Sequence, residues 1–142
     1  MGAAQRNVAF AIRRAGIAKA RPDLSDAQRE RLVAAFERAV REIPTVRQVR
    51  VGRRVIHGAG YEEGMPDTAD YLVAIDFDDV GGLATYLGHP AHDELGARFG
   101  DSLAGALVYD FEDVGLDALR DLRAGEEITL TAEAAETAER NP

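Results

Sequence analysis

The chain has 142 residues, 46% of them hydrophobic and 30% charged, which is enough for one globular domain with its own core. It has a net charge of −8 and no cysteine, which excludes disulfides and thiolate metal sites and makes nucleic acid an unfavourable partner. No apolar run approaches the roughly 20 residues of a membrane span, and the N-terminal residues lack the apolar segment of a signal peptide. We therefore expect a cytoplasmic protein that does not bind membranes.

The N-terminal region predicts one strand followed by a long loop. Residues 7–12 place Val8, Phe10 and Ile12 on one face and Asn7, Ala9 and Ala11 on the other, which is a strand pattern. Residues 13–23 show no clear period and contain Gly16 and Pro22, so we expect them to form a loop.

The first helix is clearly marked at both ends. Ser25 and Gln28 have the spacing of a capping box, in which each side chain bonds the backbone N–H of the other residue. Apolar residues then recur at helical spacing as far as Ile43, and Pro44 ends the helix.

Two strands follow, with a glycine-rich loop between them. Residues 48–55 predict the first of these strands, residues 56–70 the loop and Tyr71–Phe77 the second strand. Because the second strand is apolar on both faces, we expect both of its sides to be covered.

A broken helix and a last strand complete the pattern. Asp78 or Asp79 caps a helix that ends near Gly88, and Pro90 suits the first turn of a new helix. Residues 106–111 alternate again and predict the last strand.

The order of these elements, βαββαβ, predicts an α+β fold of the ferredoxin-like type, with a four-stranded antiparallel sheet. Helices cover one face of such a sheet, yet several strands are apolar on both faces. We therefore expect a homodimer in which two sheets pack face to face as a dimeric α+β barrel. The domain spans 6–112, and 113–142 form an acidic extension that is partly helical and frayed at its end.

The segment from Tyr86 to His92 reads Tyr-Leu-Gly-His-Pro-Ala-His. A phenol and an imidazole close together can transfer protons near neutral pH without a cofactor. The same residues also fit a helix junction in which Tyr86 fills space and His92 bonds a backbone carbonyl. His89 precedes Pro90 and is interpreted as structural. Since no third ligand lies near the two histidines, we expect no metal.

Several short motifs occur in a fixed order along the chain. They are Ala27-Gln28, Glu42-Ile43-Pro44, Val51-Gly52-Arg53, Asp76-Phe77-Asp78, His89-Pro90-Ala91-His92 and Tyr109-Asp110-Phe111. With these motifs, the chain resembles the stress-responsive A/B barrel family, whose members are small dimeric α+β barrels, over residues 6–112.

The resemblance implies a cofactor-free reaction for a protein with these motifs. One characterised member is a polyketide cyclase of the olivetolic acid cyclase type, which closes an aromatic ring by aldol condensation. Its catalytic tyrosine and histidine correspond to Tyr86 as orienting donor and His92 as general base. Two further histidines near its cavity correspond to Asn7 and Tyr71, and a tyrosine of its pocket corresponds to Phe36.

We therefore expect the chain to bind a small apolar or aromatic molecule between sheet and helices. The side chains expected to form the pocket wall are Phe10, Phe36, Tyr71, Val73, Leu83 and Leu87. Two other functions stay open at this point. One is a non-catalytic stress-response or structural barrel, and the other is a cofactor-independent monooxygenase.

Overall fold

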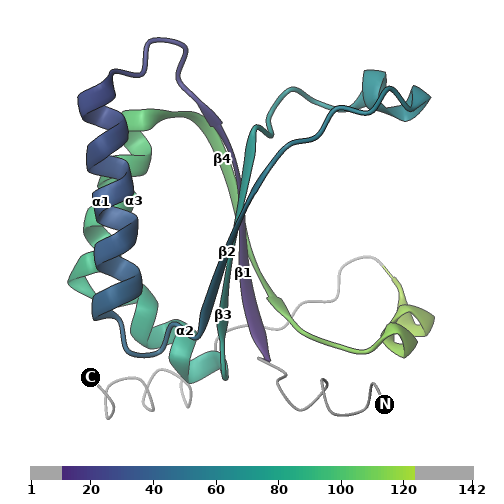
Figure 1. The fold of residues 1–142 in the computed structure, drawn as a ribbon. Coiled ribbons are helices and arrows are strands. Elements are labelled where there is room, and N and C mark those ends of the chain that lie inside the picture. The colour runs from purple at the N-terminus through teal and green to yellow at the C-terminus, as the bar shows by residue number, and fades with distance from the viewer. Residues whose placement is uncertain (1–10, 124–142) are drawn as a thin grey trace, which may run out of the picture.

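The computed structural model describes residues 11–123 and contains one antiparallel sheet with helices on one face (Figure 1). The strands lie in the order β2-β3-β1-β4, which confirms the ferredoxin-like topology predicted from the element order. The elements are β1 (Ile12–Ala20), α1 (Asp26–Glu42), β2 (Gln48–Arg53), η2 (Gly60–Gly64), β3 (Tyr71–Phe77), α2 (Val80–Leu87), α3 (Pro90–Ser102), β4 (Leu103–Glu112) and η3 (Leu116–Asp121).

The predicted position of the first strand is wrong. β1 occupies Ile12–Ala20, most of which the sequence predicts to be a loop. Small residues such as Gly16 hide the alternation in this segment, but β1 is a central strand that pairs with β3 on one side and β4 on the other. Its partners, rather than its own hydrophobic pattern, determine its position. Residues 7–10, with Asn7 and Phe10, lie outside the described residues.

The helix ends follow the predicted capping. The backbone N–H of Gln28 donates to Oγ of Ser25 at 3.1 Å, and the N–H of Ser25 donates to Oε1 of Gln28 at 2.9 Å, so the capping box is confirmed. Asp79 caps α2, since its Oδ1 accepts a hydrogen bond of 2.8 Å from the N–H of Gly82. Gly88 follows at the C-cap of α2, as predicted.

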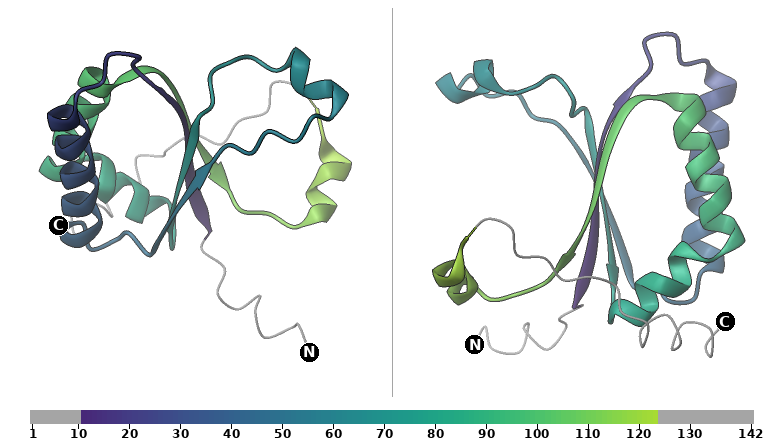
Figure 2. Two further views of the ribbon diagram at one scale, coloured as in Figure 1. Left: turned by 45° about the horizontal axis from the view of Figure 1, so that its top comes forward. Right: turned by 180° about the vertical axis from the view of Figure 1, so that it is seen from behind.

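The hydrophobic core lies between the sheet and the helical layer, which covers a single face of the sheet in all views (Figures 1 and 2). Phe77 at the end of β3 is fully buried there and packs against the ring of Tyr86 from α2. The core residues are Ile12, Ala35, Ala39, Ile43, Ile75, Phe77, Leu83, Tyr86, Ala91 and Leu95.

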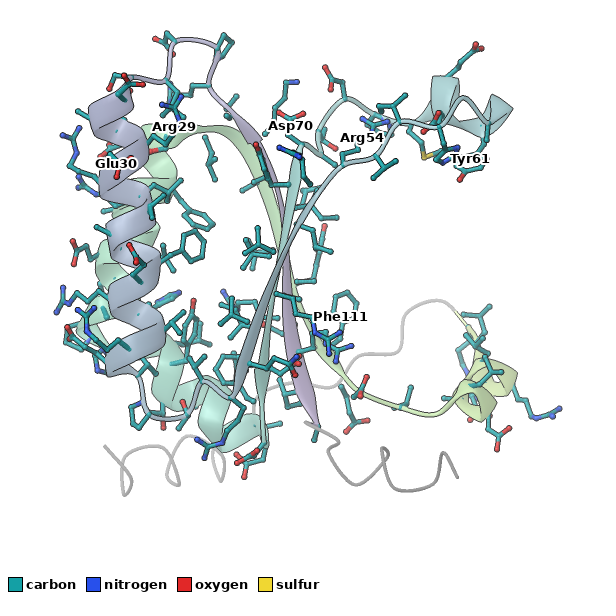
Figure 3. All side chains as sticks on the ribbon, in the orientation of Figure 1. Arg29, Glu30, Arg54, Tyr61, Asp70 and Phe111 are labelled. Carbon is teal, nitrogen blue, oxygen red and sulfur yellow. The ribbon has the colours of Figure 1, made fainter. Side chains whose placement is uncertain are left out.

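The opposite face of the sheet carries a row of apolar side chains that are wholly or partly exposed among the described residues, beside the Arg13–Asp76 ion pair. Strand pairing places Ile17, Leu72 and Leu107 side by side on this face, and Tyr109 and Phe111 follow along β4. Figure 3 shows Phe111 on the side away from the helices, and its side chain is 54% exposed. We call these five residues the open face. The sequence predicts this second apolar face correctly.

Two segments project on the same side as the open face (Figures 1 and 2). One is the connection between β2 and β3 with η2, and Tyr61 lies near its tip (Figure 3). The other follows β4 and contains η3, where Leu116, Leu119 and Leu122 are strongly exposed. These leucines are therefore not packed against the described part of their own protomer. Between residues 11 and 123, no helix is long and apolar enough to cross a membrane.

Candidate functional site

A pocket of about 100 Å³ lies between the sheet and helices α1 and α3. Its wall is apolar apart from three side chains, those of Arg14, Tyr86 and His92. The remaining lining residues are Gly16, Phe36, Val73, Ile75, Leu95, Gly96, Phe99 and Val108. An apolar cavity with a few convergent polar groups is typical of a small-molecule site.

The structure brings together part of the predicted site. Tyr86, His92, Phe36 and Val73 line the pocket. Three other predicted wall residues lie outside its lining, for three different reasons. Tyr71 stands at the exposed beginning of β3, Leu83 is buried in the core beneath α2, and Leu87 packs on the edge of that core.

Tyr86 is positioned by the core and faces the pocket. Its ring lies 5.2 Å from that of Phe77 and 4.8 Å from that of His92, between centroids. Burial raises the pKa of the Tyr86 hydroxyl, while the positive charge of Arg14 acts in the opposite direction. The hydroxyl therefore stays protonated at neutral pH. It forms no hydrogen bond with the described part of the chain, so it is available as a donor.

His92 stands in the first turn of α3, where Pro90 begins the helix. Burial lowers the pKa of His92, and the charge of Arg14 lowers it further. Asp93, the backbone carbonyl of Leu87 and Asp110 act in the opposite direction without reversing the shift. The imidazole is therefore neutral at pH 7. Its Nδ1 is buried and has no hydrogen-bond partner among residues 11–123.

His89 has a structural role at the junction of α2 and α3. Its Nδ1 accepts a hydrogen bond of 3.0 Å from the N–H of Ala91 and so caps α3. The His89 ring is not part of the pocket lining. Across the described residues, no group of three or more His, Cys, Asp or Glu side chains is arranged to hold a metal ion.

Arg14 is the polar residue of the pocket lining that the sequence does not predict. It projects from β1 into the pocket lining, and its guanidinium carbon lies 5.7 Å from the centroid of the Tyr86 ring. Two hydrogen bonds of 2.9 Å join its Nε and Nη2 to the carboxylate of Asp110 on β4. In the register that β1 adopts, Arg14 lies on the helix-covered face together with Ile12 and Gly16. Only a strand assigned to this segment would indicate that position, and the sequence predicts a loop here.

A family model for the stress responsive A/B barrel domain matches residues 12–113 of the chain. The chain belongs to this family. The matched region contains the four strands β1–β4, helices α1, α2 and α3 of the described residues, and the pocket, and it ends before η3. A comparison with curated proteins gives no significant match.

Solved structures of other proteins share this A/B barrel fold. A protein from Arabidopsis thaliana is 21% identical with a TM-score of 0.61, and the match covers 74% of this chain and 97% of that one. A dimeric ferredoxin-like protein of unknown function from Thermobifida fusca is 23% identical with a TM-score of 0.57, covering 75% and 96%. The hydroxynitrile lyase from Passiflora edulis is 14% identical with a TM-score of 0.61, covering 72% and 93%. At these identities the likeness establishes the fold alone.

Proposed function

We propose that the pocket binds a small apolar or aromatic molecule and that His92 and Tyr86 perform acid–base chemistry on it without a cofactor. The observation that carries this proposal is the pairing of the two rings. A neutral imidazole and a protonated phenol lie 4.8 Å apart, centroid to centroid, in the lining of one apolar pocket. These are the protonation states that a general base and a hydrogen-bond donor require.

In this proposal His92 removes a proton from the carbon next to a carbonyl group of the ligand. The electron pair of the broken C–H bond moves toward the carbonyl oxygen, which becomes an enolate. The Tyr86 hydroxyl donates a hydrogen bond to that oxygen as its negative charge develops. The enolate carbon then takes back the proton from the imidazolium, or it attacks a second carbonyl carbon, as in an aldol-type cyclisation. In the second case the C=O π bond breaks, and the imidazolium gives its proton to the resulting alkoxide oxygen. The apolar walls limit water around the charges.

The size of the pocket narrows the class of ligand. Sites for drug-sized molecules have volumes of about 300–1,000 Å³, whereas this cavity has about 100 Å³. A ligand of about one ring therefore fits better than an extended polyketide chain. An enzymatic role for this fold is supported by the Passiflora edulis protein, which is a hydroxynitrile lyase.

A non-catalytic barrel is the second candidate, and two observations favour it. A hydrogen bond of the His92 ring with the backbone of Leu87 fits a helix junction held by that ring. Tyr86 is only 2% exposed and packs on Phe77 as a member of the core. A tyrosine in that position contributes to stability whether or not a ligand binds. The two candidates differ in whether the pocket takes up a ligand, which a blocking substitution tests.

Gly96→Leu is expected to abolish ligand binding, whereas Gly100→Leu is expected to leave it unchanged. Both glycines lie in α3 with no atom within 4 Å of an added Cβ, but only Gly96 lines the pocket. Leucine has the higher helix propensity, so each variant should gain up to about 1 kcal/mol of stability. Ligand-observed NMR with a panel of one-ring aldehydes, ketones and acids provides the measurement. Binding that survives in the Gly96→Leu variant would place the ligand elsewhere.

We further propose a homodimer in which a second copy covers the open face and closes the barrel. Several solved structures that resemble this chain are described as dimeric ferredoxin-like proteins. An apolar surface of this kind on a lone protomer is a typical interface. In a two-fold dimer, the open face of each copy is covered by the same surface of the other copy.

Leu107→Glu is expected to yield a monomer, because it places a charge on the open face. Leu107 is 45% exposed in the protomer, so the protomer itself tolerates the change. Val33 on α1 is also 45% exposed and lies far from the open face, which makes Val33→Glu a matched control. Sedimentation velocity should show dimers for the native chain and the control. A native monomer, or a dimeric Leu107→Glu variant, would contradict the proposal.

A further inference from the structure

Arg14 is a permanent positive charge in the wall of an apolar pocket. Its side chain is only 17% exposed, and every other lining residue of the pocket in the described chain is uncharged when His92 is neutral. Burying a guanidinium costs free energy unless a partner compensates its charge. The position of its partner, Asp110, therefore decides whether the charge of Arg14 is directed into the pocket or away from it.

The Arg14–Asp110 pair is oriented with its positive end toward the pocket. The two residues stand opposite each other on β1 and β4 and are joined through Nε and Nη2 of Arg14. Arg14 lines the pocket, while Asp110 does not and is 34% exposed. In keeping with this, Arg14 affects the pKa of both Tyr86 and His92 more strongly than Asp110 does. The guanidinium, and not the carboxylate, is therefore the member of the pair that lines the pocket.

We propose that the pocket selects apolar molecules that carry a carboxylate and that Arg14 binds this carboxylate. The proposal rests on the proposed function of the pocket and names the class of its ligand. Among residues 11–123, Nη1 of Arg14 has no hydrogen-bond partner, so it retains donors for a second carboxylate beside that of Asp110.

The rest of the pocket lining favours a ligand with a single negative charge. The pocket offers one guanidinium, and the neutral His92 adds no second positive charge. The guanidinium of Arg14 lies over the Tyr86 ring, and the hydroxyl of this second lining residue is a neutral donor. The remaining wall, with Phe36 and Phe99 in contact at 5.5 Å between centroids, suits the ring or chain of the ligand. A planar carboxylate matches the fork of a guanidinium better than a spherical anion does.

The test compares acids with neutral molecules of the same shape. Benzoate and phenylacetate are titrated against benzamide and phenylacetamide at fixed ionic strength, by calorimetry or ligand-observed NMR. A charge-assisted hydrogen bond predicts that each acid binds about ten- to a hundredfold more tightly than its amide. Asp110→Asn keeps the guanidinium and removes its competing anion, so this variant should keep or increase the preference.

The double variant Arg14→Gln, Asp110→Asn removes the ion pair without leaving a single charge behind. It should bind acid and amide equally well, and comparison with the Asp110→Asn variant isolates the guanidinium. An equal affinity for acids and amides in the native chain, or a preference that persists in the double variant, would overturn the role of Arg14 while leaving the pocket as a binding site. If the native chain binds none of the four molecules, the proposed function fails together with this inference.

Discussion

Phe77→Ala is expected to lower the free energy of unfolding by about 3–5 kcal/mol, the usual cost of truncating a fully buried phenylalanine. Phe77 is 0% exposed and joins β3 to α2 through its contact with Tyr86. Its Cβ also lies 3.5 Å from the position that a Cβ on Gly82 would take, so α2 approaches β3 closely here. Truncation therefore leaves a cavity that the helix cannot easily fill.

Urea unfolding at one fixed protein concentration measures this cost, because unfolding of a dimer depends on concentration. Val33→Ala serves as the control, since Val33 is half exposed on α1 and its truncation should change stability by no more than about 0.5 kcal/mol. Loss of Phe77 also removes the support behind the Tyr86 ring, so ligand affinity should fall. A loss of less than about 1 kcal/mol in the free energy of unfolding would show that Phe77 is not tightly packed between β3 and α2.

His92→Gln is expected to slow proton abstraction from a bound ligand by about 10²- to 10⁴-fold, the typical contribution of a general base. The probe is acetophenone in D₂O, in which NMR follows deuterium exchange at the carbon next to the carbonyl group. Glutamine retains a polar side chain of similar length but cannot take up the proton. Tyr86→Phe should slow the exchange less, because it removes one hydrogen bond to the enolate oxygen.

His57→Gln is the matched control for this substitution. His57 is exposed on the connection between β2 and β3, where it contacts Tyr61 and Glu62 rather than the pocket. The control variant should therefore exchange at the native rate. An equal loss in both variants would point to a general effect of the substitution on folding, and native exchange in His92→Gln would remove His92 from the mechanism.

The elements with local signals were predictable from the sequence. The capping box of Ser25 and Gln28, the cap at Asp79 and the strand Tyr71–Phe77 all depend on residues close in the chain, and the structure contains each of them. The contact between the rings of Tyr86 and His92 also follows from local geometry, because the two residues flank a single helix break.

The features that depend on distant residues were not predictable in the same way. β1 contains Ala15, Gly16 and Ala18, whose small side chains give no hydrophobic period, and its position is set by pairing with β3 and β4. Arg14 was missed for this reason. The position of Leu95 in the pocket wall depends on how α3 packs over the sheet, and short-range sequence patterns do not specify this packing.

We propose above all that a neutral His92 and a protonated Tyr86 act together on a ligand in this pocket. Deuterium exchange of acetophenone by the native protein, measured from pH 4 to 9, tests it most directly. Because the pKa of His92 is below its usual value of about 6.5, the rate should be constant at neutral pH and fall only when the pH drops below that value. The raised pKa of Tyr86 predicts no loss on the alkaline side of this range. A rate no faster than that of buffer alone, or one that changes with a midpoint above pH 7, would contradict the claim.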